Sequence, residues 1–178
     1  MSISTLLRYE PLVWLIIESA VMFVVWTVAM ILLRGKLKRV TAIAGAVVSV
    51  LLIVLNTLVR HTINGGIGVH LIPFSSFSMV AEIPGIYRSM QLNIILFMPF
   101  GMSLPFVLPE KLRFKPLITV CIALIISVTI EVCQYIFNIG MSEIDDVIMN
   151  TLGAAIGTVS YLLVSLILKK LNKRGGKG

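Results

Sequence analysis

Charged residues are scarce in this chain. Only 13% of its 178 residues are Asp, Glu, Lys or Arg, whereas 58% are hydrophobic. A soluble domain of this size normally has about a quarter charged residues, so the composition excludes an ordinary water-soluble fold. The mean hydropathy of +1.03 indicates a protein that meets lipid over most of its surface. At this length a single domain is expected.

Cysteine is also rare, which excludes a disulfide framework. Cys121 and Cys133 lie in one hydrophobic run. Twelve residues of helix place them roughly 18 Å apart, too far for a disulfide bond. Their spacing fits no metal motif, so we expect packing roles for both. No metal site or cofactor is predicted.

Five hydrophobic runs are long enough to cross a bilayer, which takes about 20 helical residues. They predict an all-α, polytopic transmembrane bundle with one domain over 1–168 and a disordered basic tail over 169–178. The third run contains Pro99, Gly101 and Pro105, so we expect a broken helix there, which is tolerated inside a bundle. The runs are 12–33, 40–59, 92–108, 117–137 and 146–168.

The basic residues predict the orientation of these spans. Twelve of the fifteen Lys and Arg residues follow the first, third and fifth runs, in the segments 34–39, 111–115 and 169–177. By the positive-inside tendency, these segments are cytoplasmic. We therefore expect a cell membrane protein with its N-terminus outside and its C-terminus inside. This distribution also explains the net charge of +7 without nucleic-acid binding.

Most of the acidic residues fall on the opposite side, in segments predicted to be outside the cell or in the outer halves of spans. The outer segment 60–91 is long for a loop without a role. Its run from His70 to Phe74 is too apolar to stand free in water, so an interfacial or re-entrant position is predicted.

Polar residues on two consecutive spans form the candidate site. Glu131 and Gln134 share one face of the fourth run, and Asp146 and Asn150 share one face of the fifth. An antiparallel hairpin of these spans brings the four side chains to a similar depth. On the fifth run, Gly153 and Gly157 form a small-xxx-small pair that lets another helix approach closely.

Further polar residues enter from the same side, among them Arg88 and Asn93 near the third run. Together they predict a shallow polar pocket beneath the outer surface. Burying an unpaired carboxylate is unfavourable, so Glu131 is expected to be protonated or paired with Arg88 or Arg60.

A purely structural alternative applies to several of these residues. Asp145 and Asp146 are also suited to capping the fifth helix, and Asn93 to capping the third. His61 and His70 are isolated, which is more typical of surface residues than of metal ligands. Glu131 lies within a span, where an ionisable group is by default a functional candidate.

The ordered motifs resemble the VanZ-like membrane protein family over roughly residues 55–160. One patch runs from Asn93 through Phe97 and Pro99 to Gly101. A second joins Glu131-x2-Gln134 to Asp145-Asp146-x3-Asn150-x2-Gly153-x3-Gly157, and Leu71-Ile-Pro-Phe74 fits a third element, in which His70 replaces an Asn. Many relatives carry an Arg where this chain has Gly140, so Arg88 is our candidate for the replacement base.

The resemblance implies a role at the outer surface in resistance to teicoplanin, a glycopeptide antibiotic that bears a lipid. The predicted pocket and these motifs together suggest ligand-binding roles for Arg88, Asn93, Glu131, Gln134, Asp145, Asp146 and Asn150. The expected partners are membrane lipids and a lipid-linked cell-wall precursor or the lipoglycopeptide itself, with homo-oligomerisation left open.

Two other functions compete with this binding role. In a membrane-embedded enzyme acting on a lipid-linked envelope substrate, Glu131 serves as general base and Asp146 as a second acid or metal ligand. The chain has no nucleophile elbow, HExxH motif or phosphate loop, so a non-enzymatic role is favoured. A small transporter rests only on the broken third span.

Overall fold

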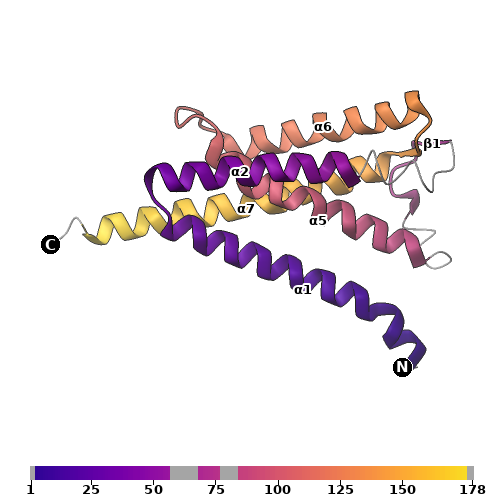
Figure 1. Ribbon diagram of the computed structural model, residues 1–178, viewed down its shortest axis with the longest axis horizontal. Helices are drawn as coiled ribbons and strands as arrows, with labels where there is room; N and C mark the ends of the chain where they lie inside the picture. Colours follow the sequence, from indigo (N-terminus) through magenta and orange to yellow (C-terminus); the bar gives the residue numbers. More distant parts are fainter. Residues whose placement is uncertain (1–2, 57–67, 77–83, 176–178) are drawn as a thin grey trace.

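The computed structural model describes residues 3–56, 68–76 and 84–175 (Figure 1). Within these residues, five helices are long and apolar enough to cross a membrane. They are α1 (Ile3–Leu32), α2 (Gly35–Val54), α5 (Pro84–Val107), α6 (Lys115–Phe137) and α7 (Ile144–Gly175). The predicted all-α bundle with five spans is confirmed.

The two ends of the bundle differ in character. The N-terminal end of α1 and the turn between α6 and α7 lie at one end, and the C-terminus lies at the other (Figure 1). We call the first the polar end, because it contains Glu131, Glu143, Asp145 and Asp146. We call the second the basic end, because the starts of α2 and α6 and the last turns of α7 carry lysines and arginines there.

Helices α5 and α7 form the tightest contact of the bundle. A side chain added at Gly153 would collide with the backbone carbonyl of Ile94, and one added at Gly157 with that of Met98. On α5, a side chain added at Gly101 would likewise collide with the backbone of Ala154 on α7. The small residues therefore let the two backbones touch, as the glycine spacing predicted, and the helix that approaches is α5.

Helix α5 is continuous, so the expectation of a broken third span is wrong. Pro99 and Pro105 both lie inside it. Each proline removes one backbone hydrogen bond, but α5 is packed against α2, α6 and α7, which hold it in place. Ser103 Oγ also donates to the carbonyl of Pro99 over 2.8 Å. The argument for a transporter loses its support.

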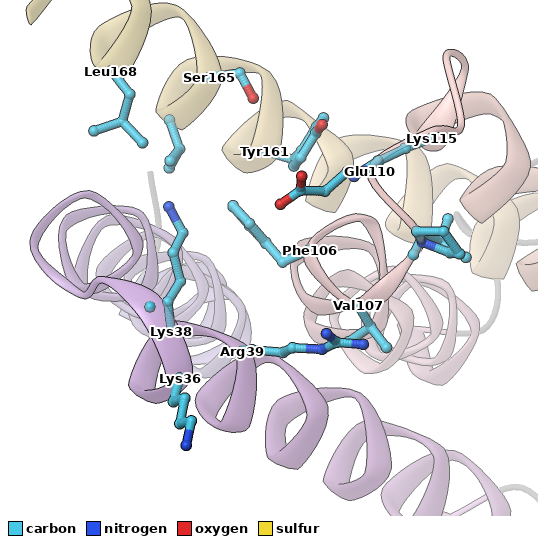
Figure 2. A pocket seen from close by; sticks show the side chains of 14 residues that line it. Lys36, Lys38, Arg39, Phe106, Val107, Glu110, Lys115, Tyr161, Ser165 and Leu168 are labelled. Carbon is cyan, nitrogen blue, oxygen red and sulfur yellow. The ribbon is translucent and has the colours of Figure 1, made fainter. Parts of the chain in front are cut away.

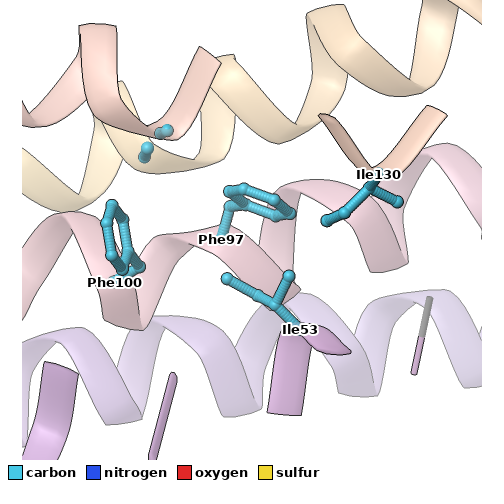
Figure 3. Close-up of a cluster of buried hydrophobic side chains, with 6 residues drawn as sticks. Ile53, Phe97, Phe100 and Ile130 are labelled. Atoms are coloured by element: carbon cyan, nitrogen blue, oxygen red, sulfur yellow. The ribbon is translucent and has the colours of Figure 1, made fainter. Parts of the chain in front are cut away.

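The hydrophobic core lies where α2, α5, α6 and α7 meet. Phe97 of α5 lies between Ile53 of α2 and Ile130 of α6, and Phe100 of α5 belongs to the same buried cluster (Figure 3). Helix α1 leans away from the others toward its N-terminus (Figure 1). It is tied to the bundle by a bond from Trp26 Nε1 to the carbonyl of Met102, and by a bond between the hydroxyls of Thr27 and Ser160.

Two short strands, which the sequence did not predict, join distant segments at the polar end. Strand β1 (Gly68–His70) pairs in parallel with β2 (Met141–Glu143), and His70 lies opposite Glu143. Of the predicted interfacial segment, 68–76 thus forms a strand and a turn, 84–91 begins α5, and 60–67 and 77–83 lie outside the described residues.

The C-terminal tail also differs from expectation. Helix α7 continues as regular helix to Gly175, so the residues from 169 to 175 are not the disordered segment predicted. The long run of α7 supplies the reason, because a helix that is already nucleated extends at little cost through lysine and leucine. Cys121 and Cys133 are free, as predicted, but Cys121 is exposed and Cys133 half-buried, so the expectation that both pack in the core is wrong.

Candidate functional site

Glu131 lies near the end of α6, with only 6% of its surface exposed. Its Oε2 accepts a hydrogen bond of 2.8 Å from the backbone N–H of Glu143, and its carboxylate also accepts one from the side chain of Ser142. Both donors belong to β2. The carboxylate therefore fixes the turn between α6 and α7, and among the described residues its hydrogen-bond donors are a backbone N–H and a hydroxyl, not a basic side chain.

Asp145, in the first turn of α7, fixes the segment that follows β1, as Glu131 fixes β2. It is 2% exposed. Its two carboxylate oxygens accept hydrogen bonds from the backbone N–H groups of Phe74 (2.5 Å) and Ser76 (2.9 Å). These donors lie beyond β1 in the chain, so Asp145 holds a loop from another part of the sequence in place.

The backbone conformation of Phe74 requires a stabilising contact. Its φ of 63° places it in the left-handed region, which is uncommon for an aromatic residue. Such a conformation persists only where the surroundings fix it. The bond from its N–H to Asp145 supplies that restraint, and it leaves the phenyl ring 58% exposed.

Asp146, unlike Glu131 and Asp145, accepts no hydrogen bond from a backbone N–H of the described residues. It is partly buried, and Glu131, Glu143 and Asp145 lie near enough for their charges to act on it. Asn93 of α5 lies beside its carboxyl group. Asn93 therefore sits well inside α5 and does not cap it, because the helix begins at Pro84.

The next turn of α7 carries Asn150, which is 2% exposed. Its Nδ2 donates a hydrogen bond of 2.8 Å to Ser127 Oγ of α6. Its Oδ1 is buried and has no partner within the described part of the chain, and the same is true of Asn93 Nδ2. Gln134, one turn beyond Glu131 on α6, is also buried.

These residues form what we call the polar cluster: Asn93, Glu131, Asp146 and Asn150, with Ser127 and Ser142 as supports. Three helices contribute to it. The sequence indicated the first four, because helical spacing places them on inward faces. It gave no signal for the two serines, since a small hydroxyl inside a span is common and its partner is known only from the structure.

Other predicted members lie apart from the cluster. Arg88 is exposed on α5. Asn56, at the end of the second predicted span, is half-buried, and its Nδ2 donates a hydrogen bond to the carbonyl of Leu52 one turn earlier. Arg60 and His61 lie outside the described residues. His70 is exposed in β1, and no group of three or more potential metal ligands occurs within the described ranges.

An apolar cavity of about 500 Å³ lies between α1, α5 and α7. Its walls are almost entirely hydrocarbon, and the polar exceptions are Ser19 and Gln91. Gln91 stands two residues before Asn93 on α5, and its Oε1 is buried without a partner among the described atoms. The cavity thus opens an apolar space near the polar cluster.

Chemically, the polar cluster offers an acidic group, an amide donor and an amide acceptor at one end of the bundle. Such groups bind hydroxyls and amides of a ligand by hydrogen bonds. The adjacent carboxylates of Glu131 and Asp146 also form a pair that could exchange a proton with a bound molecule.

Comparison with known proteins relates this chain to one curated relative and to a family. Over 77 residues it is 40% identical to Protein VanZ of Enterococcus faecium, a match that covers 43% of this chain and 46% of that protein. The chain thus matches about half the length of that relative. No solved structure matches it.

The family match is wider than this alignment. A model of the VanZ/LLP1 family matches residues 46–166, a range that includes α5, α6, most of α7 and all of the polar cluster. The motifs around Asn93, Glu131 and Asp146 fall within it. This chain therefore belongs to the VanZ/LLP1 family of membrane proteins.

Proposed function

We propose that this protein reduces susceptibility to lipoglycopeptide antibiotics of the teicoplanin type, by binding or altering an envelope lipid or the drug at the polar cluster. The single observation that carries this proposal is the partly buried group of Asn93, Asp146 and Asn150. Asn93 of α5 lies beside the carboxyl group of Asp146 on α7, and the buried atoms Asn93 Nδ2 and Asn150 Oδ1 have no hydrogen-bond partner among the described residues.

The chemistry of such a ligand matches the two parts of this region. Lipoglycopeptides and lipid-linked wall precursors carry sugars and peptide groups together with hydrocarbon chains. Sugar hydroxyls and peptide amides are partners for Asp146 and the two asparagines. The apolar cavity between α1 and α5 suits a hydrocarbon chain, because its lining exposes almost no polar surface.

We further propose that the polar end faces the outside of the cell. Such antibiotics act on the outer face of the membrane, so the site must be reached from there. The clustering of lysine and arginine at the opposite end supports this orientation through the positive-inside tendency. The exposed side chains of Leu71, Ile72 and Phe74 suit the membrane interface.

The proposal is tested by resistance measurements in a sensitive host. The wild-type chain, Asp146→Asn and Asn93→Leu are expressed at equal membrane levels, and the minimum inhibitory concentration of teicoplanin is measured. We expect each variant to lose at least fourfold of the protection. Glu110→Gln, an exposed carboxylate near the basic end, is the matched control and should keep full protection.

A second arm uses a glycopeptide without an acyl chain. If the hydrocarbon chain is part of recognition, protection against this drug should be weaker in the wild type. Full resistance in both Asp146→Asn and Asn93→Leu, at equal expression, contradicts the proposed site.

The alternative is a membrane-embedded enzyme acting on a lipid-linked envelope substrate. The closeness of Glu131 and Asp146 favours it, because paired carboxylates can act as acid and base. Purified protein incubated with labelled envelope lipids should then release a product that Asp146→Asn abolishes. Unchanged lipids across a range of divalent cations would rule out this alternative while leaving the binding role intact.

A further inference from the structure

A second cavity lies at the basic end, far from the polar cluster. It has a volume of about 780 Å³ and lies between the start of α2, the end of α5, the start of α6 and the last turns of α7 (Figure 2). Its lining contains four cationic side chains and one carboxylate. These are Lys36, Lys38, Arg39, Lys115 and Glu110. The excess of positive charge indicates an anionic ligand.

Lys115 is the cation of this cavity that is buried. Although it is a lysine at the first position of α6, only 8% of its surface is exposed. Its ammonium group lies 5.8 Å from the centroid of the Tyr161 ring, and within the described chain no carboxylate lies at ion-pair distance from it. A buried ammonium group is unfavourable unless an anion compensates it.

Lys38 provides a second cation from a different helix. Figure 2 shows it extending toward Phe106, whereas Lys36 points away from the cavity. Its ammonium group lies 5.3 Å from the centroid of the Phe106 ring. The rings of Phe106 and Tyr161 contact each other edge to face, with centroids 5.1 Å apart. Two lysines thus flank one pair of aromatic rings.

Two helices also begin at this cavity. Gly35 at the start of α2 and Lys115 at the start of α6 both line it. Neither N-cap residue, Arg34 or Phe114, forms a side-chain cap. The positive ends of two helix dipoles therefore add to the lysine charges. The C-terminal end of α5 and the carboxylate of Glu110 contribute negative charge to the cavity, but the four cationic side chains outnumber them.

The remaining walls are suited to a molecule that is only partly polar. Val164 and Leu168 of α7 and Val107 of α5 give apolar surface, and Ser165 and Tyr161 give hydroxyl groups. The cavity lies at the end of the apolar spans, at the level where lipid headgroups meet a transmembrane bundle. Basic pockets in this position are typical binding sites for anionic headgroups.

We propose that this cavity binds the phosphate of an anionic phospholipid, with Lys38 and Lys115 as its principal contacts. The phosphate lies between the two lysines, beside the helix starts, and the glycerol and acyl chains follow Val107, Val164 and Leu168 out into the bilayer. The site is separate from the polar cluster and does not depend on the function proposed for it.

The test measures lipid retention by the full-length protein in native mass spectrometry. Wild type, Lys38→Gln/Lys115→Gln and Lys170→Gln/Lys173→Gln are purified in the same detergent and offered phosphatidylglycerol or phosphatidylcholine. The two double variants lose the same charge at the same end, but only the first alters the cavity. We expect retention of phosphatidylglycerol to fall at least fivefold in the first and less than twofold in the second.

Two further variants keep the test decisive if the first double variant fails to fold. Lys38→Arg/Lys115→Arg preserves both charges and should retain phosphatidylglycerol. Glu110→Gln removes only the exposed carboxylate and should increase retention about twofold. An equal loss in both Lys→Gln pairs, or no gain in Glu110→Gln, would overturn the proposal.

An arm with labelled inorganic phosphate distinguishes a lipid from a free phosphate. We expect binding of inorganic phosphate alone to be undetectable at millimolar concentration. Retention of free phosphate that depends on Lys38 and Lys115, together with equal retention of phosphatidylglycerol and phosphatidylcholine, would overturn the assignment to a lipid.

Discussion

The carboxylate of Asp145 accepts a hydrogen bond of 2.5 Å from the backbone N–H of Phe74, across 71 positions of sequence. A second bond of 2.9 Å, from the N–H of Ser76, occupies its other oxygen. Because Asp145 lies in the first turn of α7 and Phe74 follows β1, Asp145 links these two elements at the polar end. The two neighbouring aspartates therefore have different roles. Asp145 holds a loop in place, whereas Asp146 belongs to the polar cluster.

Replacing Asp145 should release this loop. In Asp145→Ala, the N–H groups of Phe74 and Ser76 lose an ionised acceptor, and such bonds contribute about 1.5–3 kcal/mol. We expect amide hydrogen exchange at both positions to be about tenfold faster or more. Exchange mass spectrometry of peptides covering 72–76 gives the measurement. Asp146→Asn serves as the control, and equal exchange in the two variants would contradict the division of roles.

The close contact between α5 and α7 predicts that adding a methyl group at Gly153 destabilises the protein. Gly153→Ala should lower the midpoint of thermal unfolding in detergent, followed by circular dichroism, because the new methyl group meets the carbonyl of Ile94. Overpacking of this kind costs about 1–3 kcal/mol. In an open helix the same change is stabilising by about 1 kcal/mol.

The neighbouring exposed residue Leu152 provides the comparison. Leu152→Ala shortens a side chain that is 44% exposed, so its midpoint should stay close to that of the wild type. A raised midpoint in Gly153→Ala would show that α5 and α7 are farther apart than described.

Loss of the hydrogen bond between Asn150 and Ser127 should lower the free energy of unfolding. Ser127→Ala leaves the buried Nδ2 of Asn150 without its acceptor, and an unsatisfied buried donor costs about 1–3 kcal/mol. Unfolding in denaturant should show this loss. Thr129→Ser is the control, because that hydroxyl is exposed and bonds within its own helix. Equal stability of Ser127→Ala and wild type would indicate that Asn150 finds another acceptor.

The orientation can be measured directly by labelling. In a background with Cys121→Ala and Cys133→Ala, single cysteines replace Asn138 at the polar end and Glu110 at the basic end, both exposed. We expect a membrane-impermeant maleimide to label position 138 in intact cells, and position 110 only after permeabilisation. The reverse pattern would place the polar cluster in the cytoplasm and remove the basis of the proposed function.

The features that could be predicted from sequence are those set by short-range patterns. Hydrophobic run length gave the five helices, and the spacing of Gly153 and Gly157 gave a close helix contact. Helical periodicity also placed Glu131 and Asp146 on inward faces. Each depends on residues within a few turns of one another, so the signal is present in the local sequence.

The features that were missed depend on partners far away in the chain. Nothing near Asp145 indicates that its acceptor oxygens serve Phe74 and Ser76. Two strands of three residues are too short to show an alternating pattern, and only their pairing stabilises them. Likewise, Pro99 and Pro105 suggest a break when α5 is considered alone, whereas the surrounding helices keep it straight enough to remain one element.

The parallel pairing of β1 with β2 has a consequence for synthesis. Residues 68–70 emerge from the ribosome long before residues 141–143, and α5 and α6 must both be inserted between these two events. Until then β1 has no strand to pair with, and Asp145 has not yet arrived to hold Phe74. The polar end therefore cannot be completed before residues 141–145 have been made, and a nascent chain stalled before residue 141 would lack both β2 and the carboxylate that holds Phe74.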